Sequence, residues 1–327
     1  MRTIASLLLF LAWCATAGAG QIPEELLGDW SLEIESGEAG WLSIAEEDGE
    51  AVVAMFVDVG SIRPLKGVRV ADGKVLVPLK KYRKGGKKGE IVRETRAEIW
   101  WDGRLRGAII TSFPGKADEQ RDPFTGKAIP PMPAAPDLSK VEFGKPVTLF
   151  NGKDLSGWRL RRPEKINGWS VQDGLLVNET PKTDFSATGA YGNLRTDAVF
   201  GDCKLHIEFL IGAKRNSGVY LLGMYEAQVV DRDSPMQGLQ GVGSIFARVE
   251  RSKNAGYEGG RWQTYELTLV DRHMTVVLNG ETVIDNQPVV GPTPGAMHTD
   301  PMSPGPIYLQ GDHTSVKYRN IVLTPVK

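Results

Sequence analysis

Three short segments in the last third of the chain place side chains capable of chemistry on sequence with strand character. They are Asn216–Tyr220, Tyr225–Val229 and Leu309–His313, and a closing strand, Tyr318–Ile321, completes the set. Strands usually carry polar residues on one face for solubility alone. Here a carboxylate, amides and an imidazole recur in segments that otherwise have the composition of sheet core. The pattern predicts a sheet with a polar face that binds or converts a ligand.

The period of two along a strand decides which of these side chains share a face. Glu226 and Gln228 lie on one face of their strand, and Tyr225 points the other way. Carboxylate and amide groups flanked by aromatic rings suit polyhydroxylated ligands, which need many fixed hydrogen bonds. His206 and Glu208 would join this face if their own strand were a neighbour in the same sheet. For that pair we favour a solvated outer face instead.

His313 stands at a strand end and is a candidate general acid or base, because an imidazole exchanges protons near neutral pH. Asp312 could orient the ring, although adjacent side chains of an extended chain point apart. Asp231 and Asp233 follow the strand of Glu226. With Glu226 and His313 they offer oxygen-rich ligands for a divalent metal ion, although no fixed ligand spacing supports such a site.

Several familiar catalytic motifs are absent from the sequence. It contains no G-x-S-x-G nucleophile elbow, no H-E-x-x-H helix, no Walker loop and no paired-cysteine zinc motif. Asn178-Glu179-Thr180 matches the glycosylation acceptor triplet, a pattern that often arises by chance. Cys203 opens a strand, so we expect a buried small hydrophobe rather than a nucleophile.

Composition places the chain among ordinary globular proteins. It has 327 residues, a formal net charge of -1 and 41% hydrophobic residues, and this length favours two domains. The near-zero charge argues against nucleic acid as a partner, which would need a broad basic face. The one basic run, Lys80–Lys88, is rich in glycine and is interpreted as a solvated hairpin loop, with an anion-binding loop as the minority interpretation.

Residues 1–20 are predicted to be a signal peptide, which gives a secreted or periplasmic location. Arg2 supplies the charged start, residues 4–13 are apolar but too short to span a bilayer, and small residues follow at 15–19. Cys14 raises the alternative of a lipoprotein. Trp13, which is bulky where that processing prefers a small residue, makes it the less favoured one. No later segment is long and apolar enough for a membrane helix.

Strand signals dominate the rest of the chain, and helix signals are nearly absent. Residues 21–125 are predicted to form a small antiparallel β-barrel or sandwich, and the Pro-rich segment 126–142 an interdomain linker. Residues 143–327 are predicted to form a jelly-roll β-sandwich. Asp72-Gly73, Asp173-Gly174 and Asn279-Gly280 supply hairpin turns. The strands expected in the second module are 147–150, 169–171, 175–178, 192–196, 203–211, 218–222, 225–231, 243–246, 264–270, 275–278, 281–285, 307–310 and 317–324.

The second module resembles the 3-keto-disaccharide hydrolase domain family. The matching motifs are Leu149–Trp158, Trp169–Leu176, Asn216–Tyr220, Tyr225–Val229, Trp262–Tyr265, Gly305–Gln310 with His313, and Tyr318–Ile321. Together they cover about residues 145–327 and leave the first module outside. Similar domains commonly run from the glutamine directly into the Asp-His pair, whereas here Gly311 separates them.

This resemblance implies a concanavalin-like jelly roll that acts on oligosaccharides or glycosides already oxidised at C3. A C3 ketone acidifies the C2 proton, so that a base can remove it and the C1 glycosidic oxygen leaves by β-elimination. Water then adds back, and the net result is hydrolysis. The route needs a base, an acid for the leaving group and stabilisation of an enolate. It differs from the two-carboxylate route through an oxocarbenium ion.

On this resemblance Glu226 and His313 are the expected catalytic pair, one as base and the other as acid or metal ligand. The expected substrate-binding residues are Gln228, Asn216, Tyr220, Gln310 and Arg319. Arg319 has a rival interpretation as a structural cation between strands. A divalent metal ion, if one is used, would bind at Glu226, Asp231 and His313 and stabilise the enolate.

Two interpretations from other classes stay open at this point. One is a non-catalytic carbohydrate-binding module, because fold does not fix function. Exposed rings at Tyr191, Tyr220, Tyr225 and Tyr257 would suit binding. The other is an interaction domain of a surface complex that docks through its first module. Convergence of the polar residues in one pocket would favour the enzyme, and a flat aromatic platform would favour the binding module. The oligomeric state is left open.

Overall fold

The computed structural model describes residues 22–327 except 48–49, 58–62, 85–88 and 182–189. The predicted signal peptide and Cys14 therefore lie outside the described residues. The described chain is all-β, as predicted, with three short 3-10 helices, η1 (Glu24–Leu26), η2 (Leu138–Lys140) and η3 (Gly238–Gln240). Within these ranges no helix has the length and apolar character needed to cross a bilayer.

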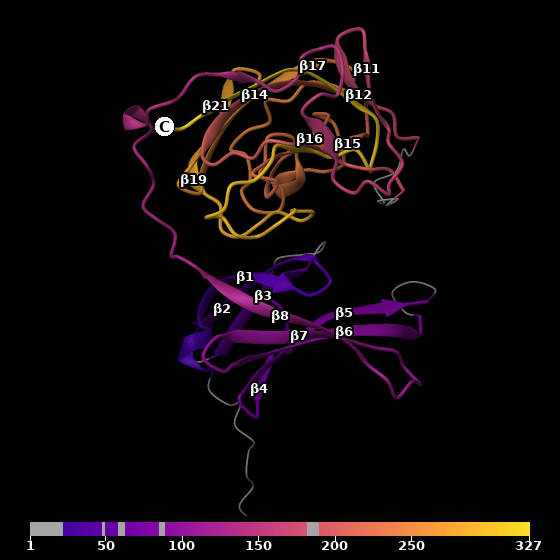
Figure 1. The fold of residues 1–327 in the computed structure, drawn as a ribbon, viewed down its shortest axis with the longest axis vertical. Helices are drawn as coiled ribbons and strands as arrows, with labels where there is room; N and C mark the ends of the chain where they lie inside the picture. The colour runs from indigo at the N-terminus through magenta and orange to yellow at the C-terminus, as the bar shows by residue number, and fades with distance from the viewer. Residues whose placement is uncertain (1–21, 48–49, 58–62, 85–88, 182–189) are drawn as a thin grey trace, which may run out of the picture.

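The first module is one antiparallel sheet of eight strands in the order β3-β2-β1-β8-β7-β6-β5-β4 (Figure 1). The sheet curls around its own core, and Leu65 N donates to Val53 O at 2.8 Å where the edge strand β3 meets the segment before β4. The predicted small barrel is confirmed in this form. Its strands are β1 (Gly28–Ile34), β2 (Ala39–Glu47), β3 (Glu50–Val57), β4 (Arg69–Ala71), β5 (Lys74–Arg83), β6 (Ile91–Trp101), β7 (Leu105–Ser112) and β8 (Gln120–Ile129).

β8 is a strand of the first module that the sequence did not predict. Five of its ten residues are exposed, four are partly buried and only Phe124 is buried, so the apolar alternation that marks a strand is missing. It nevertheless pairs with both β1 and β7. The first module therefore ends at Ile129 rather than at 125, and the linker starts at Pro130. The predicted loop at Lys80–Lys88 is also shorter, because β5 runs to Arg83.

The second module is a sandwich of two antiparallel sheets, as predicted. One has five strands in the order β10-β13-β20-β15-β16, and the other has seven in the order β11-β12-β21-β14-β17-β18-β19 with β9 paired to β21. The strands are β9 (Val147–Thr148), β10 (Trp158–Leu160), β11 (Trp169–Gln172), β12 (Leu175–Asn178), β13 (Leu194–Thr196), β14 (Cys203–Ile211), β15 (Asn216–Leu221), β16 (Tyr225–Val230), β17 (Trp262–Val270), β18 (His273–Leu278), β19 (Glu281–Pro288), β20 (Tyr308–Leu309) and β21 (Val316–Pro325).

Side-chain alternation builds the core between the two sheets. Tyr225, Ala227 and Val229 of β16 point inward and are buried, together with Val219 and Leu221 of β15. The opposite faces of these two strands remain free to carry polar groups. The predicted hairpin turns are confirmed, since both residues of Asp72-Gly73, of Asp173-Gly174 and of Asn279-Gly280 have positive φ, as a tight two-residue turn requires.

One expectation about strands in the second module is wrong, and the favoured interpretation of His206 and Glu208 is confirmed. Residues 243–246 form no strand; Ile245 makes only isolated bridges to Ala227 and Val249, because the chain turns over the outer edge of β16. His206 and Glu208 lie on β14, in the other sheet from Glu226, so they do not extend its polar face. They pair instead with Glu266 and Arg319, as the solvated outer face predicts.

Candidate active site

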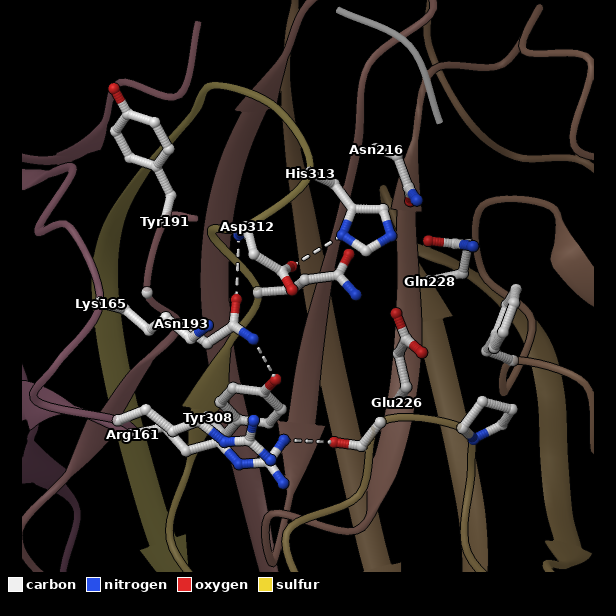
Figure 2. A pocket seen from close by; sticks show the side chains of 16 residues that line it. Arg161, Lys165, Tyr191, Asn193, Asn216, Glu226, Gln228, Tyr308, Asp312 and His313 are labelled. Carbon is white, nitrogen blue, oxygen red and sulfur yellow. Dashed lines mark hydrogen bonds and ion pairs between the residues drawn. The ribbon is translucent and has the colours of Figure 1, made fainter. Parts of the chain in front are cut away.

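A cavity of about 300 Å³ opens on the face of the five-stranded sheet that points away from the core. Figure 2 shows Glu226, Gln228 and Asn216 on one side of it and Arg161 and Lys165 on the other, with Asp312 and His313 between them. The full lining is Arg161, Arg162, Lys165, Tyr191, Gly192, Asn193, Asn216, Glu226, Gln228, Phe246, Pro294, Gly295, Tyr308, Gln310, Asp312 and His313.

The carboxyl group of Glu226 lies at the bottom of this cavity and is 3% exposed. Its Oε2 is 2.7 Å from the hydroxyl of Tyr220, and that hydroxyl is 2.9 Å from the carbonyl oxygen of Pro294. A phenol has one proton and a carbonyl oxygen can only accept. The Tyr220 hydroxyl therefore donates to Oε2 of Glu226 or to Pro294, and a protonated Glu226 would leave that proton for Pro294.

Burial is the main reason that this carboxyl group holds its proton. The pKa of Glu226 is raised to about 8, chiefly by removal from water; the hydrogen bond from the Tyr220 hydroxyl opposes this rise and the nearby carboxylate of Asp312 adds to it. A neutral carboxylic acid at pH 7 can donate a proton, as general acids must. The structure therefore gives Glu226 the properties of an acid near neutral pH.

Gly218 makes the room that Glu226 occupies. It lies on β15 directly opposite Gln228 of β16. A Cβ atom placed on Gly218 would lie 2.2 Å from Oε1 of Glu226, far inside van der Waals contact. The glycine in the Asn216–Tyr220 motif is thus explained by the close approach of this carboxyl group.

The imidazole of His313 enters the cavity from the bend after β20. Its Nδ1 lies 2.7 Å from Oδ1 of Asp312, so the two adjacent side chains face each other. The expectation that they point apart is wrong, because the chain bends at 312–314 instead of continuing as a strand. With Nδ1 bound to a carboxylate, Nε2 is left to accept a proton, which is the arrangement of an oriented general base.

Two asparagines fix the bend that carries His313. Asn193 accepts hydrogen bonds from the backbone amides of Gly311 and Asp312 at 2.7 and 3.0 Å, and its own amide donates to Tyr308 (Figure 2). Asn178 donates to the carbonyls of Gly311 and Thr314, both at 3.0 Å. Asn178 is completely buried, so the glycosylation triplet serves to hold this bend.

Gly311 is required by the close approach of a tryptophan. A Cβ atom at this position would lie 2.7 Å from the indole of Trp169. The indole nitrogen donates to the carbonyl of Gly192 at 2.9 Å, which keeps the ring against the bend. The glycine that separates Gln310 from the Asp-His pair therefore fits a local packing constraint.

Two amide side chains in the cavity wall have oxygen atoms that no described residue satisfies. They are Oδ1 of Asn216 and Oε1 of Gln310, both removed from solvent. Gln228 also lines the cavity, although its Oε1 already accepts from the backbone amide of Val229 at 2.9 Å. Buried acceptors of this kind match ligands that bring hydroxyl donors.

Basic side chains line the opposite wall. Arg161 donates to the carbonyls of Gly295 and Ala296 and lies 5.7 Å from the Tyr308 ring centre. Arg162 and Lys165 continue the wall. The cavity thus places positive charge across from the carboxyl groups of Glu226 and Asp312.

The structure brings five of the seven predicted catalytic and substrate-binding residues into one cavity, namely Glu226, His313, Gln228, Asn216 and Gln310. Tyr220 does not line it, because its ring is fully buried beneath Glu226. Arg319 lies on β21 in the other sheet, donates to Glu208 at 2.7 Å and covers the ring of Trp262. These contacts fit its rival interpretation, a structural cation between strands.

The predicted metal-ligand set does not form. Asp231 accepts hydrogen bonds from the backbone amides of Lys214 and Asp233 and does not line the cavity, because it lies on the opposite face of the strand from Glu226. Asp233 pairs with Arg232 at the surface. Across the described ranges, no three His, Cys, Asp or Glu side chains are placed to hold a metal ion.

The tyrosines do not form an aromatic binding platform. Tyr220 and Tyr225 are buried in the module, and Tyr257 lies against Arg261 outside the cavity. Of the four tyrosines considered for such a platform, Tyr191 alone lines the cavity. Polar groups that converge in one pocket, without a flat aromatic platform, favour an enzyme over a binding module.

Sequence reasoning missed Asn193, Tyr308, Arg161 and Lys165, all of which line the cavity. Asn193 lay within a predicted strand and carried no signal of its own. The Gly311-Asp312 pair did carry one, because glycine followed by aspartate often marks a turn. A bend there would have allowed Asp312 to face the histidine.

Residues 145–324 match the 3-keto-alpha-glucoside-1,2-lyase-like domain family, and the chain belongs to that family. No curated protein matches the sequence.

Several solved structures are similar to the chain. Two are proteins provisionally named glycosyl hydrolases from Parabacteroides distasonis. One is 27% identical, covering 60% of this chain and 93% of its own, with a TM-score of 0.45. The other is 20% identical, covering 56% and 94%, with a TM-score of 0.46. A non-specific endo-beta-1,3(4)-glucanase of family GH16 is 17% identical, covering 61% and 92%, with a TM-score of 0.33.

Proposed function

We propose that the protein cleaves the glycosidic bond of glycosides whose sugar carries a ketone at C3. The observation that carries the proposal is the pairing, in one cavity, of a protonated carboxyl group at Glu226 with an imidazole oriented by a carboxylate at His313. A family described as 3-keto-alpha-glucoside-1,2-lyase-like supports the substrate class. The orphan amide oxygens of Asn216 and Gln310 support a polyhydroxylated ligand.

In the proposed reaction His313 acts as the base. Its Nε2 takes the C2 proton, which the neighbouring ketone acidifies, and the electron pair forms an enolate across C2 and C3. The pair then returns to form a C1–C2 double bond as the C1–oxygen bond breaks. Glu226 gives its proton to the departing oxygen, so no free alkoxide is released. The cationic wall at Arg161 and Lys165 provides the electrostatic stabilisation that an enolate oxygen needs.

Addition of water completes a net hydrolysis. Glu226, now ionised, accepts a proton from water as the oxygen bonds to C1, and His313 returns its proton to C2. Both residues end in their starting states. Release before this step would instead give the unsaturated ketone, the product of a lyase.

The test is incubation of the protein with 3-keto-glucosides, 3-keto-trehalose and 3-keto-lactose, with the parent sugars that lack the ketone as matched controls. We expect cleavage of the oxidised sugars only, and loss of cleavage in Glu226→Gln and His313→Ala. Assays with and without chelator show whether a metal ion contributes. Equal cleavage of oxidised and parent sugars would favour a route through an oxocarbenium ion. Near wild-type activity in both variants would contradict the residue assignment.

The proposal includes export from the cytoplasm. It is supported by the charged start at Arg2, the short apolar run at 4–13 and the small residues that follow. The measurement is the N-terminal sequence of the protein recovered from the cell envelope or medium, which should begin close to residue 20.

A further inference from the structure

A row of side chains crosses four strands of the first module on its outer face. Lys127 of β8, Ser31 of β1, Trp41 of β2 and Phe56 of β3 lie opposite one another in successive pairs. Trp41 and Phe56 belong to the buried core of the second module, whereas their inward-facing neighbours fill the core of the first. The second module therefore covers this face (Figure 1).

The ring of Trp41 packs against the guanidinium group of Arg248, 4.9 Å from its centre. Nε of Arg248 donates to the carbonyl of Pro292 at 2.7 Å. Gly291 fits tightly beside both, since a Cβ atom there would lie 2.6 Å from Arg248 and 2.8 Å from the indole. Burial lowers the pKa of Arg248 to about 9, so the aromatic face stabilises a cation that has lost its water.

Arg248 thereby joins the two loops that support Glu226. In the first loop, Phe246 lines the cavity and its amide donates to the Glu226 carbonyl at 2.9 Å. In the second, Thr293 Oγ1 accepts from the amide of Glu226 at 3.0 Å. The Pro294 carbonyl, next in the same loop, accepts from the Tyr220 hydroxyl that also contacts Glu226.

The second of these loops has another attachment to the first module. The hydroxyls of Ser31 and Thr299 lie 2.8 Å apart, and Thr299 also donates to the carbonyl of Gly40. Lys127 pairs with Asp300 at 2.7 Å. The segment 291–300 is thus held by the first module on both sides of the residues that contact Glu226.

We propose that the first module is part of the catalytic unit and that Trp41 is a positioning residue, which acts through Arg248 on the loops that hold Glu226. Its effect on turnover rests on the proposed function; its effect on the carboxyl group does not. The first module then has a role in the chemistry of the second, although none of its described residues lines the cavity.

The experiment compares Trp41→Ala with Trp41→Phe in the full chain. Trp101→Ala is the matched control, because Trp101 is an exposed tryptophan of the same module and lies away from this interface, against Trp30. The readouts are the titration of the Glu226 carboxyl group by carbon-13 NMR, and kcat and KM on a 3-keto-glucoside. Thermal unfolding identifies the variants that remain folded.

In Trp41→Ala we expect the titration of Glu226 to move down from about 8 by about one pH unit or more, because the loosened loops admit water. We expect kcat to fall about tenfold or more, with KM within about threefold. Trp41→Phe and Trp101→Ala should retain the wild-type titration and kcat.

A folded Trp41→Ala variant with an unchanged titration would overturn the inference. If that variant does not fold, Arg248→Lys decides, since it keeps the charge but loses the planar group that stacks on Trp41 and bonds Pro292. Its titration should shift in the same direction, and an unchanged one overturns the inference. If the wild type cleaves no 3-keto-glucoside while Trp41→Ala still shifts the titration, the proposed function fails and the inference stands.

Discussion

Tyr220 and Glu226 sit opposite each other on β15 and β16, with 2.7 Å between the phenol oxygen and the carboxyl oxygen. The phenol also reaches the Pro294 carbonyl at 2.9 Å, and it has one proton to share. Burial raises the pKa of Glu226 to about 8, and a protonated Glu226 would leave the phenol proton for Pro294. Burial is therefore the main ground for a neutral acid, and the contacts of Tyr220 are compatible with it.

The first prediction concerns the alkaline limb of the pH profile. Because the pKa of Glu226 is about 8, cleavage should fall as pH rises above 8 and the acid loses its proton. The charged or titratable groups that face it are Tyr220, Asp312, His313, Arg161 and Lys165. The measurement is kcat/KM between pH 6 and 10 on a 3-keto-glucoside. An activity that is level through pH 9 would contradict the role of Glu226 as acid.

The second prediction concerns stability against pH. The pKa of Glu226 is about 8 in the folded state and near 4.5 when exposed, so folding favours the protonated form. This contribution is complete below pH 4.5, declines as pH rises to about 8 and is absent above. Each unit of difference between the folded and exposed pKa values is worth about 1.4 kcal/mol of unfolding free energy, so the total is several kcal/mol. Denaturant unfolding should show this decline in wild type and a flatter profile in Glu226→Gln.

The third prediction concerns the space beside Glu226. Gly218→Ala would put a methyl group 2.2 Å from Oε1 of Glu226, so the carboxyl group must move and kcat should fall about 100-fold. The matched control is Gly201→Ala, where a Cβ atom meets nothing within 4 Å. Equal activity in the two variants would show that the position of the carboxyl group is not critical.

The fourth prediction concerns the orientation of His313. Asp312→Asn replaces the carboxylate that lies 2.7 Å from Nδ1 with a neutral amide. The imidazole is then a poorer base with a less certain tautomer, and kcat should fall about 10²-fold or more. Asp233→Asn, which alters an exposed aspartate paired with Arg232, is the control. A rise in KM with unchanged kcat would assign Asp312 to substrate binding instead.

The fifth prediction tests the removal of Arg319 from the site. Arg319→Gln breaks the pair with Glu208. Both residues lie in the sheet that does not carry the cavity, so kcat/KM should stay within about twofold of wild type. The side chain is 40% exposed, and a pair of this kind is worth at most about 1 kcal/mol of unfolding free energy. A large loss of activity at unchanged stability would return Arg319 to the site.

The fold could be predicted where one strand face is buried, because alternation then appears in the sequence. β14 shows it in full, with Cys203, Leu205, Ile207 and Phe209 buried in turn. β8 could not be predicted, since pairing on both sides rather than burial holds it in place. The assignment of each strand to one of the two sheets of the second module could not be predicted either. Strand parity placed Glu226 and Gln228 together but could not show that Glu208 belongs to the other sheet.

Within the site, prediction succeeded for residues on regular strands and failed for contacts made by bends. Glu226 and Gln228 followed from the period of two. The Asp312–His313 pair depended on a bend that two asparagines far away in the sequence, Asn178 and Asn193, hold in place. Tyr220 was predicted to bind substrate, and only the structure shows that its buried hydroxyl contacts Glu226 and Pro294 instead.

The shared core of the two modules has a consequence for folding. Trp41 and Phe56 of the first module are packed into the same cluster as Tyr225 and Val289 of the second, so neither module keeps all of its buried surface without the other. The two should therefore melt as one cooperative unit and give a single calorimetric transition. A chain cut at the Pro-rich linker would have to reassemble across that interface before either half regained its full stability.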